Sequence, residues 1–268
     1  MSDTKTGILF KAATVLLLRE AEDGFEVFMV KRPAQSAGFP NALVFPGGRL
    51  DPADESIETM AAHCRRPEGI SDDDLAHRIC GIRETFEEAC ILLARPRGAE
   101  ELIGGDGSIA IVEKYRKPLH SGEIGLAEIA AAENLEYACD LMIPFAHWVT
   151  PEGRPRRFDT RFFLAPAPND QVAVHDDVEL VHSVWTSPVR IVEESDQGLW
   201  NVVFVTRSNL LKLGDAKTIP EAFERARTSR VVMISPQVER VEGGSIFRIP
   251  ADAGYAVTER FEPASFQS

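Results

Sequence analysis

The sequence has no long hydrophobic run and no excess of positive charge. No stretch approaches the roughly 20 apolar residues that a helix needs to cross a bilayer, and no signal-peptide pattern stands at its start, so we expect no membrane partner. Lys and Arg number 29 against 42 Asp and Glu, which leaves a formal charge of −13. Because nonspecific nucleic-acid binding needs a basic surface, this balance argues against nucleic acid as a partner.

Cysteine is also scarce. The four cysteines form no CxxC pair and no disulfide framework, a pattern typical of reduced thiols, and we expect a cytoplasmic protein. A zinc site could be drawn from two neighbouring pairs, His63 with Cys64 and His77 with Cys80. Their spacing matches no usual zinc pattern, so helix packing is the favoured interpretation. The final residues do not form a Ser-Lys-Leu peroxisomal signal.

What the sequence does contain is a stripe of carboxylates. Glu84, Glu87 and Glu88 stand at positions i, i+3 and i+4, so a helix would place their side chains next to one another. Like charges at that spacing repel. A shared divalent cation would make the arrangement favourable, since Mg²⁺ and Mn²⁺ prefer carboxylate oxygens. A solvated acidic helix face is the alternative, and the upstream sequence weighs against it.

Upstream, an apolar strand end leads into Pro46-Gly47-Gly48, a turn whose backbone can approach a ligand closely. Together with the acidic helix, this turn resembles the Nudix box, Gly-x5-Glu-x7-Arg-Glu-U-x-Glu-Glu-x-Gly-U, in which U is apolar. Gly48 opens the motif and Asp54 takes the first Glu position. Arg83 and the three glutamates fill its core, and Ile91 takes the last apolar place.

The chain departs from this motif in its spacing and at single positions. Between Gly48 and Arg83 lie 34 residues where the plain motif has 13, so about 21 are inserted. The insertion leaves Glu55 and Glu58 as alternatives to Asp54 in the first acidic position. Two further positions differ: Thr85 stands where an apolar residue is usual, and Cys90 replaces the closing glycine.

An insertion at this point is similar to that of the Nudix branch that includes the animal peroxisomal coenzyme A diphosphatase. Three further stretches support the resemblance, at residues 145–151, 157–163 and 249–255. The resemblance implies an α/β fold, a Nudix-type α/β/α sandwich with a mixed β-sheet and helical insertions. We expect a single domain over residues 8–260, with insertions at about 55–74 and 99–143.

The resemblance also implies a metal site that holds Mg²⁺ or Mn²⁺. Glu84 and Glu88 would be direct ligands, and Glu87 a third ligand or the base that positions water. The carbonyl of Gly48 would be an additional ligand. Arg83 would hold Glu84 in its rotamer and offset its charge, and Glu84 itself acts as the base in some members of the family.

The implied reaction is the hydrolysis of a nucleoside diphosphate linked to another group. The branch implies CoA or acyl-CoA as this small-molecule substrate, giving 3′,5′-ADP and (acyl-)phosphopantetheine. An NDP-sugar, NADH or a dinucleoside polyphosphate is the alternative substrate. A Nudix-like module that senses a nucleotide without cleaving it is the alternative function. The sequence is compatible with a monomer and with a homodimer.

A few residues outside the motif are candidates for substrate contact. Arg32 at a strand end and Arg157, which follows Arg154 and Arg156, could grip substrate phosphates, and solvated surface is the alternative for each. Glu179 and His182 stand where the family often has an auxiliary acid, although a half-exposed strand position is the favoured interpretation of each.

Hydrophobic patterns predict the remaining elements. The helix that carries the glutamates should begin after Ser71 as N-cap and bury one face. Strands are predicted at 14–19, 25–30, 156–165 and 178–185, and a last hairpin about Gly243-Gly244. Further helices are predicted at 109–115, 124–134 and 208–227, the last broken at Ile219-Pro220.

Overall fold

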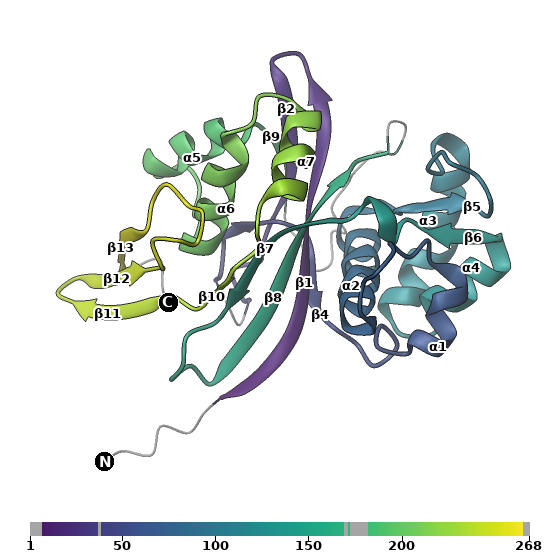
Figure 1. Cartoon of the computed structure of the whole chain (residues 1–268), viewed down its shortest axis with the longest axis horizontal. Helices are drawn as coiled ribbons and strands as arrows, with labels where there is room; N and C mark the ends of the chain where they lie inside the picture. Colours follow the sequence, from purple (N-terminus) through teal and green to yellow (C-terminus); the bar gives the residue numbers. More distant parts are fainter. Residues whose placement is uncertain (1–6, 37–38, 169–170, 172–181, 265–268) are drawn as a thin grey trace.

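The computed structural model describes residues 7–36, 39–168, 171 and 182–264, and its centre is an eight-stranded mixed sheet (Figure 1). The sheet consists of β1 (Ile8–Ala21), β2 (Gly24–Lys31), β3 (Leu43–Val44), β4 (Gly47–Arg49), β7 (Ile143–Val149), β8 (Arg156–Pro166), β9 (His182–Thr186) and β10 (Met233–Ile234). Neighbouring strands follow the order β10-β7-β8-β1-β2-β3, while β4 pairs with β1 and β9 pairs with β2.

Strand β1 is the centre of this sheet because its apolar run is buried on both faces. Its neighbours differ in direction: β8 runs parallel to it, and β2 and β4 run antiparallel. The pairing with β4 sets Gly48 opposite Ala13, which fixes the turn of the box to the most central strand. The position of the glycines therefore follows from strand pairing, not from a free loop.

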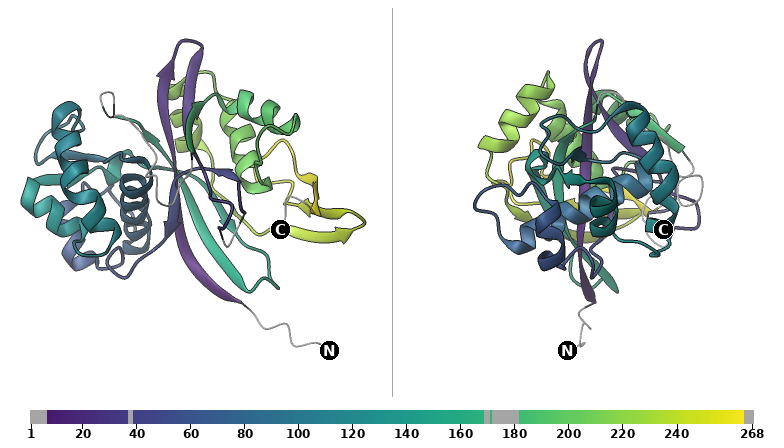
Figure 2. Two further views of the ribbon diagram at one scale, coloured as in Figure 1. Left: turned by 180° about the vertical axis from the view of Figure 1, so that it is seen from behind. Right: turned by 90° about the vertical axis from the view of Figure 1, so that its right-hand side faces the viewer.

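Helices cover both faces of the sheet, as the two sides of Figures 1 and 2 show. One layer contains α1 (Ile57–Met60), α2 (Asp72–Ala89), α3 (Gly105–His120) and α4 (Leu126–Glu133), with short 3₁₀ turns at Ala61–His63 and Cys139–Leu141. The other contains α5 (Pro188–Asp196), α6 (Phe204–Gly214) and α7 (Ile219–Thr228). Each layer encloses its own hydrophobic cluster against the sheet. The expected α/β/α sandwich with a mixed sheet is confirmed.

Helix α2 packs closely against the sheet. Ser71 caps it as predicted, its hydroxyl accepting a hydrogen bond from the backbone of Asp74 at 3.1 Å. A Cβ on Gly81 would lie 2.7 Å from the Met142 side chain and 2.9 Å from that of Val15 on β1. Glycine at this position therefore allows the helix to pack against the strand, and this holds the acidic stripe in place.

The two segments predicted as insertions pack against each other and against α2. Arg65 joins them: its backbone N–H donates to Tyr137 at 2.8 Å, and its side chain pairs with Glu136 at 2.8 Å. Short strands β5 (Ala94–Pro96) and β6 (Leu135–Tyr137) form a separate ladder there, which the sequence analysis did not predict. Tyr137 is fully buried, and its hydroxyl donates to the carbonyl of Leu126 at 2.6 Å.

The C-terminal segment forms a separate three-stranded sheet. It contains β11 (Gln237–Val241), β12 (Gly244–Arg248) and β13 (Glu259–Pro263). The predicted hairpin is present as β11 and β12, whereas β13 was not predicted. Of the strand predicted at 178–185, the part at 178–181 lies outside the described residues, and β9 is the remainder. Among the described residues, no helix is long and apolar enough to cross a membrane.

Candidate active site

The Gly47-Gly48 turn and the glutamates of α2 meet at the centre of the molecule. Glu88 accepts a hydrogen bond from the backbone N–H of Gly47, with Oε2 at 2.9 Å from the nitrogen. A Cβ added at Gly48 would lie 2.3 Å from Oε1 of Glu84, closer than real Cβ contacts allow. Glycine at position 48 is therefore what lets the carboxylate of Glu84 lie against the backbone of β4.

Arg83 is the hub that fixes this arrangement. Its Nη1 lies 2.9 Å from Glu84 and 3.5 Å from Glu87, and its Nη2 donates to Asp54 at 2.9 Å. The same Nη2 donates to the carbonyl of Arg49 at 2.8 Å, just after the glycine turn. Asp54 is 2% exposed and is thus the carboxylate that pairs with Arg83 across the insertion.

The alternatives to Asp54 lie elsewhere. Glu55 forms an ion pair with Lys11 at 2.8 Å, on the exposed start of β1, and Glu58 is exposed on α1. The guanidinium of Arg83 is buried and can form two parallel hydrogen bonds to one carboxylate. It needs a buried acidic partner, because an unpaired charge in the interior is costly. The side chain at position 54 meets that need.

The electrostatics of the site leave negative charge in excess. Burial raises the pKa of Glu84 to about 7, Arg83 opposes this shift, and Glu87 adds to it. Burial also raises the pKa of Glu87, although Arg83 and His120 oppose it. For Arg83, burial disfavours the charge, but Glu84 and Asp54 outweigh it and raise the pKa above its ordinary value. A bound cation would stabilise these carboxylates in their charged form.

The donor set at the turn fits a hard divalent cation. Carboxylate oxygens of Glu84 and Glu88 meet the backbone of the glycine turn, and oxygen donors of this kind are those that Mg²⁺ and Mn²⁺ prefer. Across the described residues, no three His, Cys, Asp or Glu side chains are already gathered as a metal cluster. Arg83 and the Gly47 amide are the present partners of these carboxylates, so metal binding exchanges one set of partners for another.

The two single departures from the motif have structural explanations. Thr85 is fully buried, and its hydroxyl donates to the carbonyl of Gly81 at 2.6 Å, so its polar atom is satisfied within the helix. Cys90 ends α2 in the left-handed conformation, with φ 57°. A glycine at this helix end would adopt that conformation without strain, which accounts for the residue that the motif usually has there.

The helix α3 contributes residues that sequence reasoning missed. Nε of Arg116 donates to the carbonyl of Glu87 at 2.7 Å. Nδ1 of His120, near the end of the same helix, lies 3.7 Å from Oε2 of Glu87. No local pattern identifies them, because their position follows from the packing of the second insertion on α2. Two basic side chains therefore accompany the middle glutamate of the stripe.

The arginines predicted to bind substrate lie in different surroundings. Arg32 follows β2, and its Nε is buried without a hydrogen-bond partner in the described part of the chain. Arg157 is also buried, and its Nε donates to the carbonyl of Thr150 at 3.0 Å, which ties β8 to the end of β7. Among described contacts, none joins Arg157 to the box residues. Substrate contact stays a prediction for both.

The remaining candidates are placed as follows. Glu179 lies outside the described residues, and His182 stacks on Trp200 with ring centroids 5.9 Å apart. Cys80 was one of the four residues considered as a zinc site in the sequence analysis. Its sulfur lies 3.7 Å from the carbonyl oxygen of Gly48. Burial raises the pKa of the Cys80 thiol well above its ordinary value, and Asp54 adds to the effect, so a neutral thiol is favoured over a thiolate ligand.

Comparison with known protein families identifies the family to which this chain belongs. The model of the family described as the NUDT19 Nudix domain matches residues 59–202, more than half of the chain. The chain belongs to that Nudix family. The match covers the whole acidic stripe and both of its basic neighbours on α3.

Relatives of known name agree with this Nudix assignment. The acyl-coenzyme A diphosphatase NUDT19 of Gallus gallus is 29% identical over 227 residues, covering 66% of this chain and 58% of that protein. The Homo sapiens protein of the same name is 28% identical over 210 residues, covering 64% of this chain and 56% of that protein. The chain thus spans less than two thirds of the length of these two relatives.

A solved structure confirms the Nudix fold. The crystal structure of a NUDIX hydrolase from Alicyclobacillus acidocaldarius superposes with a TM-score of 0.67 and 26% sequence identity. The match covers 84% of this chain and 99% of that one. The helical segments and the mixed sheet therefore form an architecture that this Nudix hydrolase shares over nearly its full length.

Proposed function

We propose that this Nudix protein is a metal-dependent hydrolase that cleaves the diphosphate of CoA or acyl-CoA, giving 3′,5′-ADP and (acyl-)phosphopantetheine. The observation that carries the reaction is the carboxylate stripe of Glu84, Glu87 and Glu88 against the Gly47-Gly48 turn, fixed by Arg83. Support for the substrate comes from the two relatives named acyl-coenzyme A diphosphatase.

The proposed step is a hydrolysis in which water replaces one phosphate oxygen. The water oxygen forms a bond to one phosphorus, and the bond from that phosphorus to the bridging oxygen breaks. The bridging oxygen leaves with the other phosphate. Glu84 or Glu87 accepts a proton from the water, and both are partly buried beside Arg83, where solvent competes little for that proton.

Other residues of the chain hold the reacting groups. Glu84, Glu88 and the Gly48 carbonyl would hold Mg²⁺ or Mn²⁺, which when bound neutralises phosphate charge and activates water. Arg83 holds Glu84 in one orientation through the 2.9 Å contact and offsets part of its charge. Arg32 and Arg157 are the proposed phosphate contacts, because a guanidinium suits bidentate contact with phosphate oxygens.

The test is product analysis by mass spectrometry with Mg²⁺ or Mn²⁺. The substrate panel contains CoA, acetyl-CoA, NADH, UDP-glucose, ADP-ribose and diadenosine polyphosphates. Glu88→Gln is the inactive variant, because it keeps the size of the side chain and removes its charge. Glu113→Gln is the matched control, since Glu113 is an exposed glutamate on α3.

We expect 3′,5′-ADP from CoA with the wild-type protein and with Glu113→Gln. Glu88→Gln should be slower by at least ~10²-fold, because the variant removes the charge of a proposed metal ligand and the metal would supply much of the charge stabilisation. Cleavage of another panel member in place of CoA would keep the hydrolase and discard the CoA assignment. Binding without cleavage of any member would favour the nucleotide-sensing module.

A further inference from the structure

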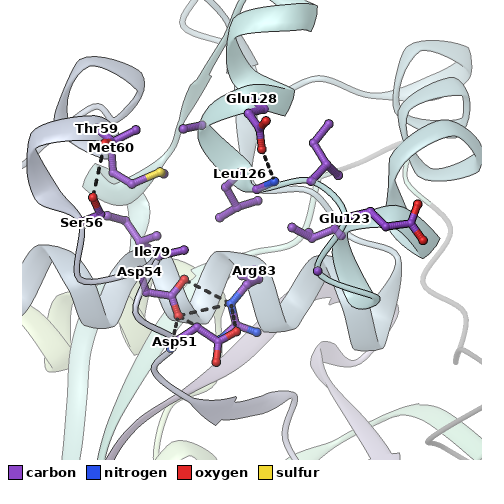
Figure 3. A pocket seen from close by; sticks show the side chains of 16 residues that line it. Asp51, Asp54, Ser56, Thr59, Met60, Ile79, Arg83, Glu123, Leu126 and Glu128 are labelled. Carbon is purple, nitrogen blue, oxygen red and sulfur yellow. Dashed lines mark hydrogen bonds and ion pairs between the residues drawn. The ribbon is translucent and has the colours of Figure 1, made fainter.

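A cavity of about 440 Å³ lies between the two inserted segments, beside the candidate active site (Figure 3). Thr59 and Met60 of α1 line one wall, and Leu126 at the start of α4 lines the opposite wall. Ile79 and Arg83 of α2 form the base. A volume of this size is within the range of small-molecule sites. Both insertions contribute to its lining.

The cavity and the carboxylate stripe share one wall. The guanidinium of Arg83 lines the cavity, and its Nη1 contacts Glu84 at 2.9 Å and Glu87 at 3.5 Å. Leu119, which also lines the cavity, is the residue before His120, whose ring lies near Glu87. A substrate whose diphosphate lies on the stripe would therefore have one end close to this space.

The charges of the wall select which end of a substrate fits. Carboxylates line the cavity at Asp51, Asp54, Glu123 and Glu128. Arg83 is the cation of this wall, and Asp54, Glu84 and Glu87 already neutralise it. A cleft lined by one sign of charge repels a ligand of that sign. A nucleoside that carries a further phosphate is therefore disfavoured there.

The apolar part of the wall favours an uncharged chain instead. Met60, Ile79, Leu119 and Leu126 line the cavity and belong to the hydrophobic cluster of this layer. Burying the apolar surface of a ligand against such side chains is favourable. The hydroxyls of Ser56 and Thr59, which also line the cavity, lie 3.3 Å apart and can exchange hydrogen bonds with an amide.

We propose that this cavity binds the uncharged acyl-pantetheine half of the substrate and excludes the 3′-phosphorylated nucleoside. The assignment rests on the proposed function, because it places the two halves of an acyl-CoA on either side of the carboxylate stripe. It makes the two insertions the part of the chain that determines specificity. The longer the acyl chain, up to the capacity of the cavity, the tighter the substrate binds.

The test measures binding of a probe that has no diphosphate, so that it does not depend on catalysis. The probe is S-octanoylpantetheine, titrated calorimetrically into the whole 268-residue chain, with 3′,5′-ADP as the second probe. Thr59→Trp fills the cavity from an exposed position on α1. Glu58→Trp is the matched control, because Glu58 is the adjacent exposed residue and does not line the cavity.

We expect wild type and Glu58→Trp to bind S-octanoylpantetheine with equal affinity, and Thr59→Trp to bind it about ten-fold more weakly or worse. Affinity for 3′,5′-ADP should be the same in all three. Ser56→Phe, a second exposed filling variant, should repeat the result if Thr59→Trp is poorly folded by circular dichroism. Equal affinity for S-octanoylpantetheine in the filled variants, or no binding by wild type, would overturn the proposal.

A kinetic measurement separates this proposal from the proposed function. The ratio of kcat/KM for octanoyl-CoA to that for CoA should fall about ten-fold in Thr59→Trp and stay constant in Glu58→Trp. A constant ratio in both variants with active enzyme would refute the cavity assignment and keep the hydrolase. If no CoA is cleaved, the proposed function fails, and the binding titration still decides whether the cavity takes the acyl-pantetheine group.

Discussion

At the scale of single residues, the site depends on the absence of a side chain at Gly48. The carboxylate of Glu84 occupies the volume that a Cβ on residue 48 would need, with Oε1 at 2.3 Å from it. The conflicting atom is the far end of a flexible side chain, not a backbone atom. A side chain at position 48 would therefore displace the carboxylate and leave the strand in place.

We expect Gly48→Ala to reduce activity by roughly 10²-fold, because a shift of about 1 Å in a reacting group has an effect of that size. The free energy of unfolding should change by less than ~1 kcal/mol, since the carboxylate can rotate away. Steady-state kinetics and urea unfolding measure the two effects. Gly107→Ala on α3, where a Cβ makes only ordinary contact at 3.4 Å, is the control. A large loss of stability with activity retained would contradict this account.

Another single residue, His77, makes stability depend on pH. It is 1% exposed, its Nδ1 lies 2.6 Å from the carbonyl oxygen of Asp73, and its buried Nε2 has no partner among the described residues. Burial lowers the pKa of His77 below its ordinary 6.5, and nearby Arg161 adds to the effect while Asp73 and Asp159 oppose it. As the pH falls, His77 therefore takes up a proton at a higher pH in the unfolded chain than in the folded protein.

We expect this contribution to be complete above about pH 6.5 and to be lost as the pH falls toward the lower pKa of the folded state. His77→Gln should lose less stability than wild type between pH 7.5 and about pH 5. Urea unfolding at several pH values measures this, with His63→Gln, whose side chain contacts Arg97, as the control. The same pH slope in wild type and His77→Gln would disprove the assignment.

At the scale of elements, the helix α2 begins and ends by different rules. Its start is a serine cap that the sequence predicts. Its end at Cys90 is left-handed, with φ 57°, although the residue is not glycine. A non-glycine residue pays about 1–2 kcal/mol in this conformation. Cys90 is also 5% exposed, so its side chain recovers a similar amount by burial.

Because these two effects nearly cancel, we expect Cys90→Gly to change the free energy of unfolding by less than ~1 kcal/mol. Cys90→Val should destabilise the protein by about 2 kcal/mol or more, because a β-branched residue is strongly strained at positive φ. Chemical denaturation of the two variants provides the comparison. A valine variant as stable as the glycine variant would show that backbone strain is not the governing effect.

The sequence predicted this element and its motif well, because both depend on local spacing. Ser71 as the cap, the acidic stripe and the contact of Arg83 with Glu84 follow from residues read in order. The pairing of Arg83 with Asp54 was not predicted, because the insertion left Glu55 and Glu58 as alternatives. Arg116 and His120 could not be predicted, since they reach Glu87 only through the packing of α3 on α2. Side chains brought together by an insertion leave no periodic signal in the sequence.

At the scale of the whole molecule, metal binding should be visible as added stability. A ligand that binds only the folded state at 100 times its Kd stabilises it by ~2.7 kcal/mol. For a chain of this size we expect Mn²⁺ to raise Tm by about 5–10 °C. Differential scanning calorimetry measures this shift. Glu84→Gln should lose most of it, and an equal shift in both proteins would place the ion elsewhere.

The fold as a whole was predictable where apolar runs are long. The strands β1 and β2 follow from such runs, the sandwich from the resemblance to the Nudix family, and the C-terminal hairpin from its Gly-Gly turn. The ladder of β5 with β6 and the strand β13 were missed, because each is short and its partners are set by tertiary packing. The cavity between the insertions belongs to the same class of feature, since it is formed by segments that meet only after folding.

The parallel pairing of β1 with β8 has a consequence for how the chain is made. Ile8 pairs with Arg156, so the central strand and its longest partner are 148 residues apart in the sequence. At synthesis rates of ~5–20 residues per second, the ribosome needs roughly 7–30 s to produce the partner after the first strand has appeared. During that interval the apolar edge of β1 that pairs with β8 remains unpaired. Nascent chains should therefore engage holding chaperones until β8 emerges, and a stall before residue 156 should expose an aggregation-prone hairpin.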